Sequence, residues 1–507
     1  MIADYPFELA QEFGVVPVAD DGGAVAVATA PHMTVAALAA ARQRIGKPLR
    51  TQAVDETRFR QLLTQWYAQA GVPRAVDSGT TLSASASSTP AAASVLSAND
   101  DGPTDLLATG SVTSDEAPAV RIVGELLRDA LARGASDVHL DATHGGGRVR
   151  FRVDGVLGDV RDTDAATHAA MIARCKVMAN LDIAERRLPQ DGRLQVLIAG
   201  CRVDVRIATL PTQYGERAVL RLLDTSAARL DLESLGCPAA TVAALRQAVR
   251  APHGLVLVTG PTGSGKTTTL YAAVSELDRE RLNVVSVEDP VEYALDRVAQ
   301  TQVNPRIELS FARALRSILR HDPDVIIVGE IRDRETAEIA IQASLTGHLV
   351  LASLHTNTAG AAVTRLVDMG VEPYLIASSL RGVVAQRLVR RLCPQCRHVA
   401  PTTPSEAALL IQHGVVPSGA GTGAIAALYQ SRGCAQCNDT GYRGRIGLYR
   451  WLPASSAVVR GIHDRVADTA LEALASEQGW PALAPAARDT LERGETSLAE
   501  VLRVVAL

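Results

Sequence analysis

One glycine-rich stretch constrains the fold of this chain more than any other feature of the sequence. It matches the pattern GxxxxGK[ST] and consists of Gly260, Pro261, Thr262, Gly263, Ser264, Gly265, Lys266 and Thr267. The apolar run 255–259 precedes it and predicts a buried strand, whereas 268–276 predicts a helix. In that setting the loop N–H groups and the helix start surround the phosphates of a nucleotide. We therefore expect this loop and Thr268 to bind ATP, with Lys266 reaching the β- and γ-phosphates and the Thr267 hydroxyl holding Mg²⁺.

Four apolar runs predict the sheet around this loop: 255–259, 284–288, 324–328 and 349–353. Each is apolar along nearly its whole length, which is typical of strands buried on both faces of a parallel sheet flanked by helices. Open α/β sheets bind their ligands at the carboxyl ends of the strands. The residues that follow each run are therefore the first candidates for the site.

Acidic residues follow two of these runs. Glu330 comes just after 324–328, where it suits the Mg²⁺ or water side of a phosphate site. Glu292 lies in Glu-Asp-Pro-Val-Glu-Tyr (288–293), and it is the candidate for positioning or deprotonating the attacking water. The alternative for either acid is a solvated charge at a strand end or turn.

Two histidines flank the run 349–353. His348 precedes it, where it could sense the γ-phosphate or bridge strand and loop, and His355 follows it. A hydrogen-bonded core histidine is the alternative, which we leave open for His355.

Four of the seven cysteines form two CxxC pairs: Cys393 with Cys396, and Cys434 with Cys437. Two such pairs in a reducing compartment predict a four-cysteine Zn²⁺ site, structural because four thiolates leave no open position. The alternative is redox-active or unliganded pairs. The other three cysteines are expected to be small buried residues: Cys175, Cys201 and Cys237.

The remaining chain divides by composition. We predict a small N-terminal domain (1–72), a flexible Ser/Ala-rich linker (73–117), a middle domain (118–225), a connector (226–238) and the domain with the glycine-rich loop (239–507), which includes a cysteine subdomain at about 390–450. Expected strands are Val15–Val18, Val25–Val27, Val149–Val153, Gly155–Val160, Leu194–Ile198 and Cys201–Thr209, and expected helices are Thr34–Arg44, Glu56–Tyr67 and Val120–Arg133. Pro17 places the first strand at a sheet edge.

Overall charge and aromatic content argue against nucleic acid as a partner. The net charge is −4, the pI is about 6.3 and aromatic residues make up 3% of the chain, which disfavours nucleic acid as a ligand. No apolar run approaches the ~20 residues that span a bilayer, and the first residues lack the pattern of a signal peptide. We expect a cytoplasmic protein that reaches the membrane only through a partner.

Several longer segments resemble one family, the type II/type IV secretion ATPases, and are most similar to the type II (general) secretion pathway protein E family. They are ASDVHLDA (135–142), RVRFRVDGVL (148–157), DIAERRLPQDGR (182–193), VDVRIATLPTQYGERAVLRLLD (203–224), GPTGSGKTTTLY (260–271), SVEDPVEY (286–293), LRHDPDVIIVGEIRD (319–333), TGHLVLASLHTNTA (346–359) and TGYRGRIGLY (440–449). The resemblance covers about 118–450. The chain departs from it in the insert 73–117, in Arg450-Trp451 where relatives more often carry an acid, and in 455–507.

The resemblance implies a hexameric ring of subunits, each with a PAS-like α+β middle domain and a RecA-like P-loop core. It makes 286–293 the aspartate box with catalytic Glu292, 324–333 the Walker B region with Glu330, and 346–356 the histidine box. Arginines of the middle domain contact nucleotide in related enzymes, which suggests Arg206 and Arg221; ordinary surface salt bridges are the alternative. The N-terminal domain, 1–72, is implied to bind the cytoplasmic domain of an inner-membrane platform protein.

The predicted function is thus a motor that hydrolyses ATP to ADP and phosphate and powers pseudopilus assembly and protein export. A type IV pilus extension motor would use the same chemistry and is the first alternative. A nucleic-acid translocase or a nucleotide-gated scaffold is a more distant one.

Overall fold

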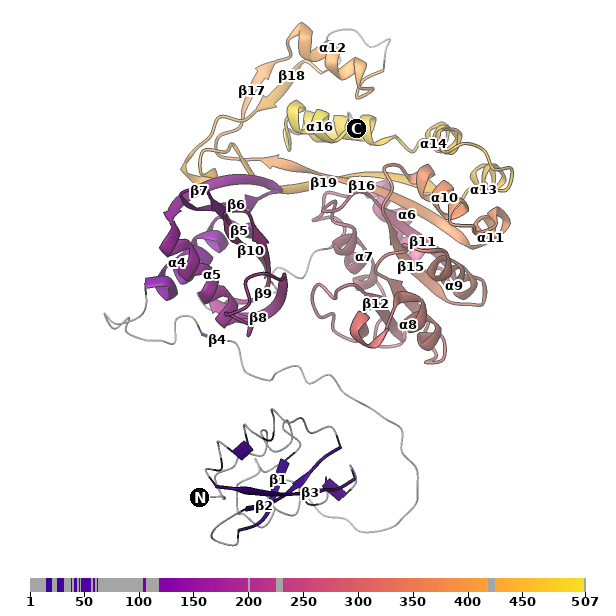
Figure 1. Cartoon of the computed structure of the whole chain (residues 1–507). Coiled ribbons are helices and arrows are strands. Elements are labelled where there is room, and N and C mark those ends of the chain that lie inside the picture. Colours follow the sequence, from indigo (N-terminus) through magenta and orange to yellow (C-terminus); the bar gives the residue numbers. More distant parts are fainter. Residues whose placement is uncertain are drawn as a thin grey trace. The chain divides into compact units, whose positions relative to one another are not determined.

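The computed structural model describes residues 15–20, 25–31, 47–55, 104–105, 118–198, 201–224, 231–417 and 425–505, with isolated residues between 38 and 62. It divides into two compact units, 1–97 and 98–507 (Figure 1). Most of the predicted helices Thr34–Arg44 and Glu56–Tyr67, and of the linker, lies outside the described residues. Thr104–Asp105, within the predicted linker, instead form a two-residue strand, β4, parallel to β8 (Gln190–Ile198).

The first unit contains a three-stranded sheet. Its strands are β1 (Val15–Asp20), β2 (Val25–Thr29) and β3 (Leu49–Ala53), in that order. β1 runs antiparallel to β2, and β2 runs parallel to β3. Pro17 lies in the outer strand β1, so the predicted edge position is confirmed.

The middle domain is a sheet with two helices on one face (Figure 1). The sheet order is β4-β8-β9-β10-β5-β6-β7. Its further elements are α4 (Pro118–Ala132), β5 (Ala135–Thr143), β6 (Gly146–Val153), β7 (Val156–Asp164), α5 (Ala165–Met178), β9 (Cys201–Thr212) and β10 (Gly215–Asp224). Alternate residues of β6 such as Val149 and Phe151 face a core with Leu127 and Met171, and the arginines that alternate with them along the strand face outward. The sequence did not predict β5, β10 or α5 individually.

The second large sheet carries the glycine-rich loop. Its order is β13-β12-β14-β15-β11-β16-β19, and all neighbours are parallel except β16 and β19. The strands are β11 (Gly254–Thr259), β12 (Val284–Glu288), β13 (Val298–Gln302), β14 (Val325–Val328), β15 (Leu349–Leu354), β16 (Leu380–Leu392) and β19 (Tyr442–Pro453). The four predicted parallel strands are confirmed.

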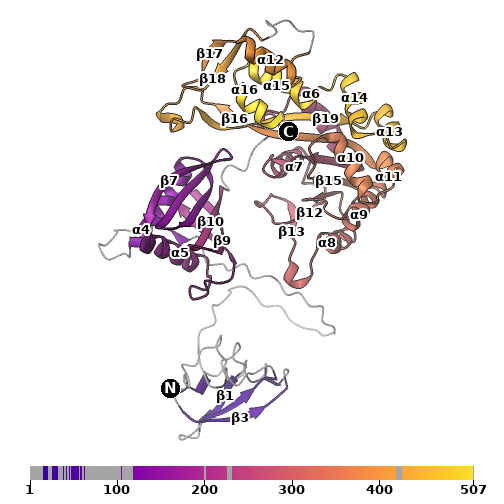
Figure 2. The same ribbon diagram turned by 45° about the horizontal axis from the view of Figure 1, so that its top comes forward.

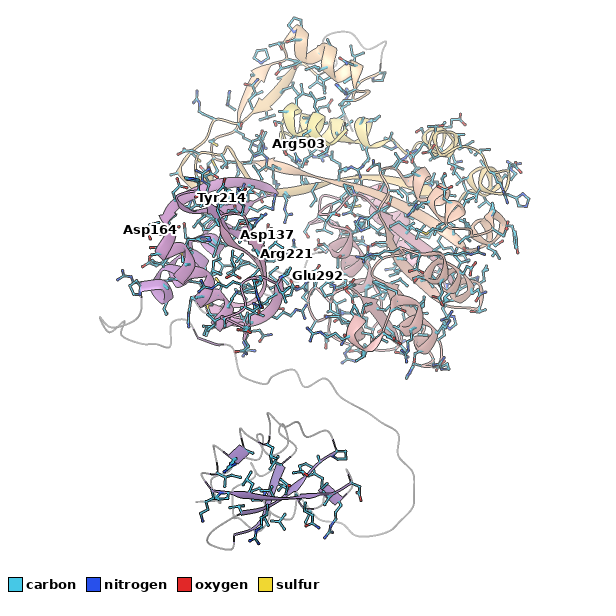
Figure 3. The ribbon with its side chains drawn as sticks, in the orientation of Figure 1. Asp137, Asp164, Tyr214, Arg221, Glu292 and Arg503 are labelled. Carbon is cyan, nitrogen blue, oxygen red and sulfur yellow. The ribbon has the colours of Figure 1, made fainter. Side chains whose placement is uncertain are left out.

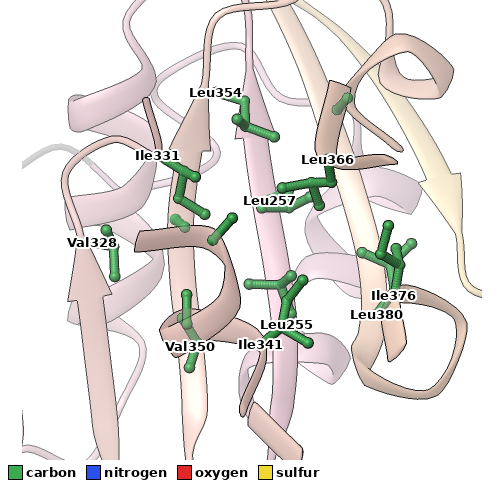
Figure 4. Packing of buried hydrophobic residues seen from close by; sticks show 14 of the residues in the cluster. Leu255, Leu257, Val328, Ile331, Ile341, Val350, Leu354, Leu366, Ile376 and Leu380 are labelled. Atoms are coloured by element: carbon green, nitrogen blue, oxygen red, sulfur yellow. The ribbon is translucent and has the colours of Figure 1, made fainter. Parts of the chain in front are cut away.

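Helices cover both faces of this sheet. One face packs on α6 (Ala239–Val249) and α7 (Lys266–Ser275). The other packs on α8 (Phe311–Ile318), α9 (Arg334–Leu345), α10 (Ala359–Asp368) and α11 (Pro373–Ser379). Figure 4 shows this second core, in which Leu257 of β11 and Val350 of β15 lie among Ile341 and Leu366. A sheet buried on both faces holds its strand tips in fixed positions.

The C-terminal part surrounds the long antiparallel pair β16–β19. It consists of β17 (His398–Pro401), α12 (Pro404–Gln412), β18 (Ala427–Gln430), α13 (Ser456–His463), α14 (Asp468–Glu477), α15 (Leu483–Glu492) and α16 (Leu498–Val505), with a short 3-10 turn at Ala435–Cys437. Another short 3-10 turn, Pro305–Ile307, lies earlier in the chain between β13 and α8. Figure 2 shows β17, β18, α12, α15 and α16 gathered at one end of β16.

Candidate nucleotide site and cysteine cluster

The glycine-rich loop joins β11 to α7, as predicted. Gly265 adopts a left-handed conformation (φ 86°) at the start of α7, which favours glycine because it has no Cβ. Lys266 is the first residue of the helix. Its Nζ donates hydrogen bonds to the carbonyls of Gly260 (2.9 Å) and Pro261 (3.1 Å). The lysine thus folds back over its own loop, at the place where phosphate oxygens would compete with these carbonyls.

The neighbouring strand β16 forms the back wall of the loop. Gln386 Nε2 donates to the Ser264 carbonyl (2.5 Å). A Cβ on Gly260 would lie 2.6 Å from the Gln386 carbonyl oxygen, so the loop can pass here only with glycine. Two buried atoms of the described residues have no partner at this wall, Ser264 Oγ and Gln386 Oε1. A glycine-lined cradle beside the unpaired Ser264 hydroxyl, which can donate a hydrogen bond, fits a bound phosphate group.

Lys266, His355 and Glu330 form a chain of contacts at the tips of β11, β15 and β14. His355 Nδ1 lies 3.5 Å from Lys266 Nζ, and His355 Nε2 lies 3.2 Å from Glu330 Oε2. Glu330 also pairs with Arg332. The structure therefore places Glu330 and Lys266 at one edge of the sheet, as the sequence predicted.

Burial sets the charge state of this chain of contacts. It lowers the pKa of Lys266 to about 8, although Glu330 opposes the shift. Burial, together with the charge of Lys266, also lowers the pKa of His355 below its usual range. At pH 7 the lysine is therefore mainly charged and the histidine neutral, so His355 can donate one hydrogen bond and accept another.

The structure corrects the prediction for His348. Its Nδ1 lies 3.0 Å from the Ala343 carbonyl, and it precedes β15. The glycine-rich loop follows β11, which runs parallel to β15 in register from Gly254↔Leu349. His348 therefore lies at the opposite sheet edge, roughly 20 Å along the strand from His355. Within one chain, His355 and not His348 reaches the phosphate loop.

The two glutamates of segment 288–293 have different environments. Glu288 is buried and accepts hydrogen bonds from Tyr271 of α7, from Ser286 Oγ (2.5 Å) and from Gln300 Nε2 (3.1 Å). Burial and this carboxylate raise the pKa of Tyr271. Glu288 thus ties the strand tip to the helix that begins at Lys266, a role that the sequence did not reveal.

Glu292 faces the middle domain. Its Oε2 lies 3.4 Å from Arg206 Nη2, which also donates to the Val291 carbonyl (2.7 Å). Arg206 therefore lies beside the loop that carries Glu292, whereas its contact with nucleotide stays a prediction. Arg221 bonds Asp137 (3.0 Å) instead, and Figure 3 labels both side chains on the middle-domain sheet.

The strand register adds an arginine that the sequence analysis missed. Across β8, β9 and β10, Arg193 pairs in register with Arg206, and Arg206 with Arg221. Arg193 Nη1 also lies 3.5 Å from Gln302 Oε1 of β13. The three arginines form one row on the outer face of the sheet, which carries the charged residues. The period-2 alternation of apolar and charged residues along each strand was the signal that could have predicted this row.

The four cysteines of the CxxC pairs lie together, with all sulfurs within 4.8 Å of one another. The nearest separations are 3.9 Å (Cys393–Cys434), 3.8 Å (Cys396–Cys437) and 3.7 Å (Cys434–Cys437). Tetrahedral Zn²⁺ with bonds of about 2.3 Å places its sulfurs about 3.8 Å apart. Backbone N–H groups of Gly441 and Cys434 also point at Cys437 Sγ (3.2 and 3.3 Å), which favours a thiolate. The donor set therefore fits Zn²⁺. Among the other cysteines, Cys175 and Cys237 are buried as expected, and the Cys201 side chain lies outside the described residues.

A membrane-spanning helix is absent from the described part of the chain. None of the helices there is both long and apolar enough to cross a bilayer.

Comparison with proteins of known structure finds the same fold in two other proteins. The ATPase DotB of Legionella pneumophila has a TM-score of 0.56 at 20% identity, covering 80% of this chain and 100% of DotB. The pilus retraction motor PilT with bound ADP has a TM-score of 0.50 at 24% identity, covering 75% and 96%. These likenesses confirm the predicted RecA-like α/β core.

Relatives in sequence cover nearly the whole chain. The type II secretion system protein E of Aeromonas hydrophila is 42% identical over 99% of this chain and 96% of its own length, and that of Pseudomonas aeruginosa is 45% identical over 94% and 91%. The type II secretion system ATPase E of Vibrio cholerae is 48% identical over 77% and 76%. Residues 4–67 match a domain family described for GSPII protein E, and residues 112–503 match the type II/IV secretion system protein family. The chain therefore belongs to the type II/IV secretion system protein family and, within it, to the E proteins of type II secretion.

Proposed function

We propose that this chain hydrolyses ATP to ADP and phosphate and that the reaction drives pseudopilus assembly and protein export. The contact chain Lys266–His355–Glu330 beside the glycine-rich loop is the observation that carries this proposal. Lys266 follows β11 and Glu330 follows β14, and only β15 with His355 separates these strands, which supports a site for the terminal phosphate of ATP between the cation and the acid. Relatives at 42–48% identity are type II secretion proteins, which favours export over pilus extension.

Each site residue has a proposed role. Lys266 exchanges the Gly260 and Pro261 carbonyls for oxygens of the β- and γ-phosphates. The Thr267 hydroxyl and Glu330 would hold Mg²⁺, which supplies neutralisation of phosphate charge when bound. Glu292 positions the attacking water and accepts its proton, and for this it must separate from Arg206.

The larger assembly is also part of the proposal. We infer a hexameric ring in which Arg206 and Arg221 contact nucleotide, and in which arginines from neighbouring subunits stabilise developing phosphate charge. The N-terminal domain, 1–72, would bind the cytoplasmic domain of an inner-membrane platform protein and hold the motor at the cytoplasmic face. Zn²⁺ would close the cysteine cluster as a structural ion.

Phosphate release from MgATP by the purified full-length chain tests the proposal. Glu330→Gln and Glu292→Gln should each lower kcat by about 100-fold or more while MgATP still binds, because each removes a group used in the transition state. Lys266→Ala should abolish MgATP binding itself. The matched control is Glu338→Gln on α9, an exposed acid 2.7 Å from Arg334, which should leave turnover unchanged.

Two results would contradict the proposal. One is a wild-type chain that binds no MgATP, and the other is turnover by Glu330→Gln at the wild-type rate. Light scattering with and without MgATP would test the ring, and a mass that stays at one subunit under both conditions would exclude it.

A further inference from the structure

A buried arginine without an acidic partner lies beside the phosphate loop. Arg387 on β16 is only 5% exposed. Its Nη2 donates to the carbonyl (2.9 Å) and to Oδ1 (3.1 Å) of Asn357, and its Nη1 donates to the Gln386 carbonyl (3.2 Å). Its Nε has no partner, and in the described part of the chain no carboxylate forms an ion pair with it.

Two other arginines of the same strand pair, the half-buried Arg390 and the buried Arg450, show what Arg387 lacks. Arg390 bonds Glu500 at 2.7 Å, and Arg450 bonds Glu472 at 2.9 Å. Both pairs offset the cost of removing a guanidinium from water, which is high for an uncompensated charge. Arg387 has only neutral acceptors among the described residues, so no ion pair offsets its charge.

The position of Arg387 indicates which anion could offset its charge. Its acceptor, the Gln386 carbonyl, forms the wall behind Gly260 of the phosphate loop. Its other acceptor, Asn357, closely follows His355, which contacts Lys266 and Glu330. The charge of Arg387 is close enough to contribute to lowering the pKa of Lys266, behind the larger effect of burial. Lys266 and Arg387 are thus neighbouring cations, of which only Lys266 has an acid nearby, Glu330.

We propose that the phosphates of a bound nucleotide supply this missing negative charge, which makes Arg387 a positioning residue that favours ATP over ADP. The inference rests on the proposed nucleotide site. The positive charge of Arg387 attracts the phosphates electrostatically. The hydrogen bonds from its guanidinium to Asn357 also hold that loop, and with it His355, in place. Because the third phosphate adds charge, the preference should grow with the number of phosphates.

Calorimetric titration of the full-length chain with MgATP and with MgADP tests the proposal. Arg387→Gln should weaken MgATP binding about tenfold and MgADP binding only about threefold, magnitudes typical of coupling between neighbouring groups. The matched control is Arg381→Gln on the same strand. Arg381 also donates to a backbone carbonyl, that of His253 (2.8 Å), but at the opposite end of β16. It should keep both dissociation constants at the wild-type values.

The nucleotide-free melting temperature separates this role from a structural one. Arg387→Gln should not lower it, because the variant removes an uncompensated buried charge. A lower melting temperature together with an unchanged ratio of MgATP to MgADP affinity would overturn the proposal. If Arg387→Gln fails to fold, Arg387→Lys serves as the test. This variant keeps the charge and should keep the preference for MgATP over MgADP. Loss of that preference in Arg387→Lys would overturn the proposal. A wild-type chain that binds neither nucleotide would overturn the proposed function itself, whereas equal ratios in wild type and Arg387→Gln contradict only this inference.

Discussion

At the scale of single residues, the site depends on a lysine that burial makes easier to deprotonate. Lys266 is 9% exposed, and burial lowers its pKa from 10.5 to about 8. Glu330 limits the shift because it favours the charged ammonium. The lysine therefore loses its charge within a pH range that is accessible to binding experiments. This matters because phosphate binding requires the charged form.

This titration predicts the pH dependence of MgATP binding. The folded-state pKa is below the ordinary value, so the free chain loses the lysine charge as the pH rises through about 8. The dissociation constant for MgATP should be flat below that pH and should rise about tenfold per pH unit above it. Titration calorimetry at pH 8.5 in two buffers of different ionisation enthalpy should show proton uptake on binding.

Lys266→Arg provides the control, because a guanidinium stays charged over this range. Its affinity should be lower but independent of pH between 7 and 9. A wild-type dissociation constant that stays constant up to pH 9.5 would contradict the prediction.

Sequence alone predicted the residues that a local pattern identifies. The glycine-rich loop, Glu330 and the four cysteines lie where their spacing placed them. The local pattern does not separate His348 from His355, because both flank one strand. The strand direction favours His355, which lies at the carboxyl end of β15. Arg387 and Glu288 had no such signal, because their partners are Asn357 and Tyr271, which are distant in sequence.

At the scale of elements, the same contrast separates the strands. The four apolar strands were predictable because each is buried on both faces. β16 and β19 were not, because they bury Gln386, Arg387 and Arg450 among apolar residues and so lack a simple pattern. Arg450, at a point where the sequence departs from the resemblance, pairs with Glu472 on α14.

The ion pair between Arg450 and Glu472 should fasten α14 to β19. Glu472 also accepts a hydrogen bond from the Gly360 N–H (2.7 Å) at the start of α10. Arg450→Met should cost about 3–5 kcal/mol of unfolding free energy, because it leaves the carboxylate partly buried and unpaired. The double variant Arg450→Met/Glu472→Gln should cost less than the sum of the two single variants, as measured by denaturant unfolding of the full-length chain.

The exposed pair Arg334–Glu338, in which Nε and Oε1 are 2.7 Å apart, serves as the comparison. Arg334→Met should cost less than about 1 kcal/mol. If the Arg450 and Glu472 variants were strictly additive, the two side chains would not act as a coupled pair.

At the scale of the whole molecule, the cysteine cluster closes a long excursion of the chain. Cys393 follows β16, whereas Cys434 and Cys437 come shortly before β19, so the cluster joins the two ends of the segment that contains β17, α12 and β18. The CxxC spacing predicted the ligands. The enclosed fold was not predictable, because Leu410 and Leu428 of this segment pack in a core with residues such as Leu448 and Leu491 of other elements. The domain boundaries remain predictions; the division into units at 97 and 98 falls within the predicted linker.

Removal of the metal should therefore loosen this segment first. The purified chain should contain about one Zn²⁺. A strong chelator, or the variant Cys434→Ser/Cys437→Ser, should lower the melting temperature and expose residues 394–441 to limited proteolysis, because ligand binding to the metal contributes directly to folding. Cys237→Ala, which removes a buried cysteine outside the cluster, should leave the cleavage pattern and the metal content unchanged. A metal-free chain whose segment 394–441 resists protease as well as the untreated protein would contradict this prediction, because the core around Leu410 and Leu428 would then hold the segment without the metal.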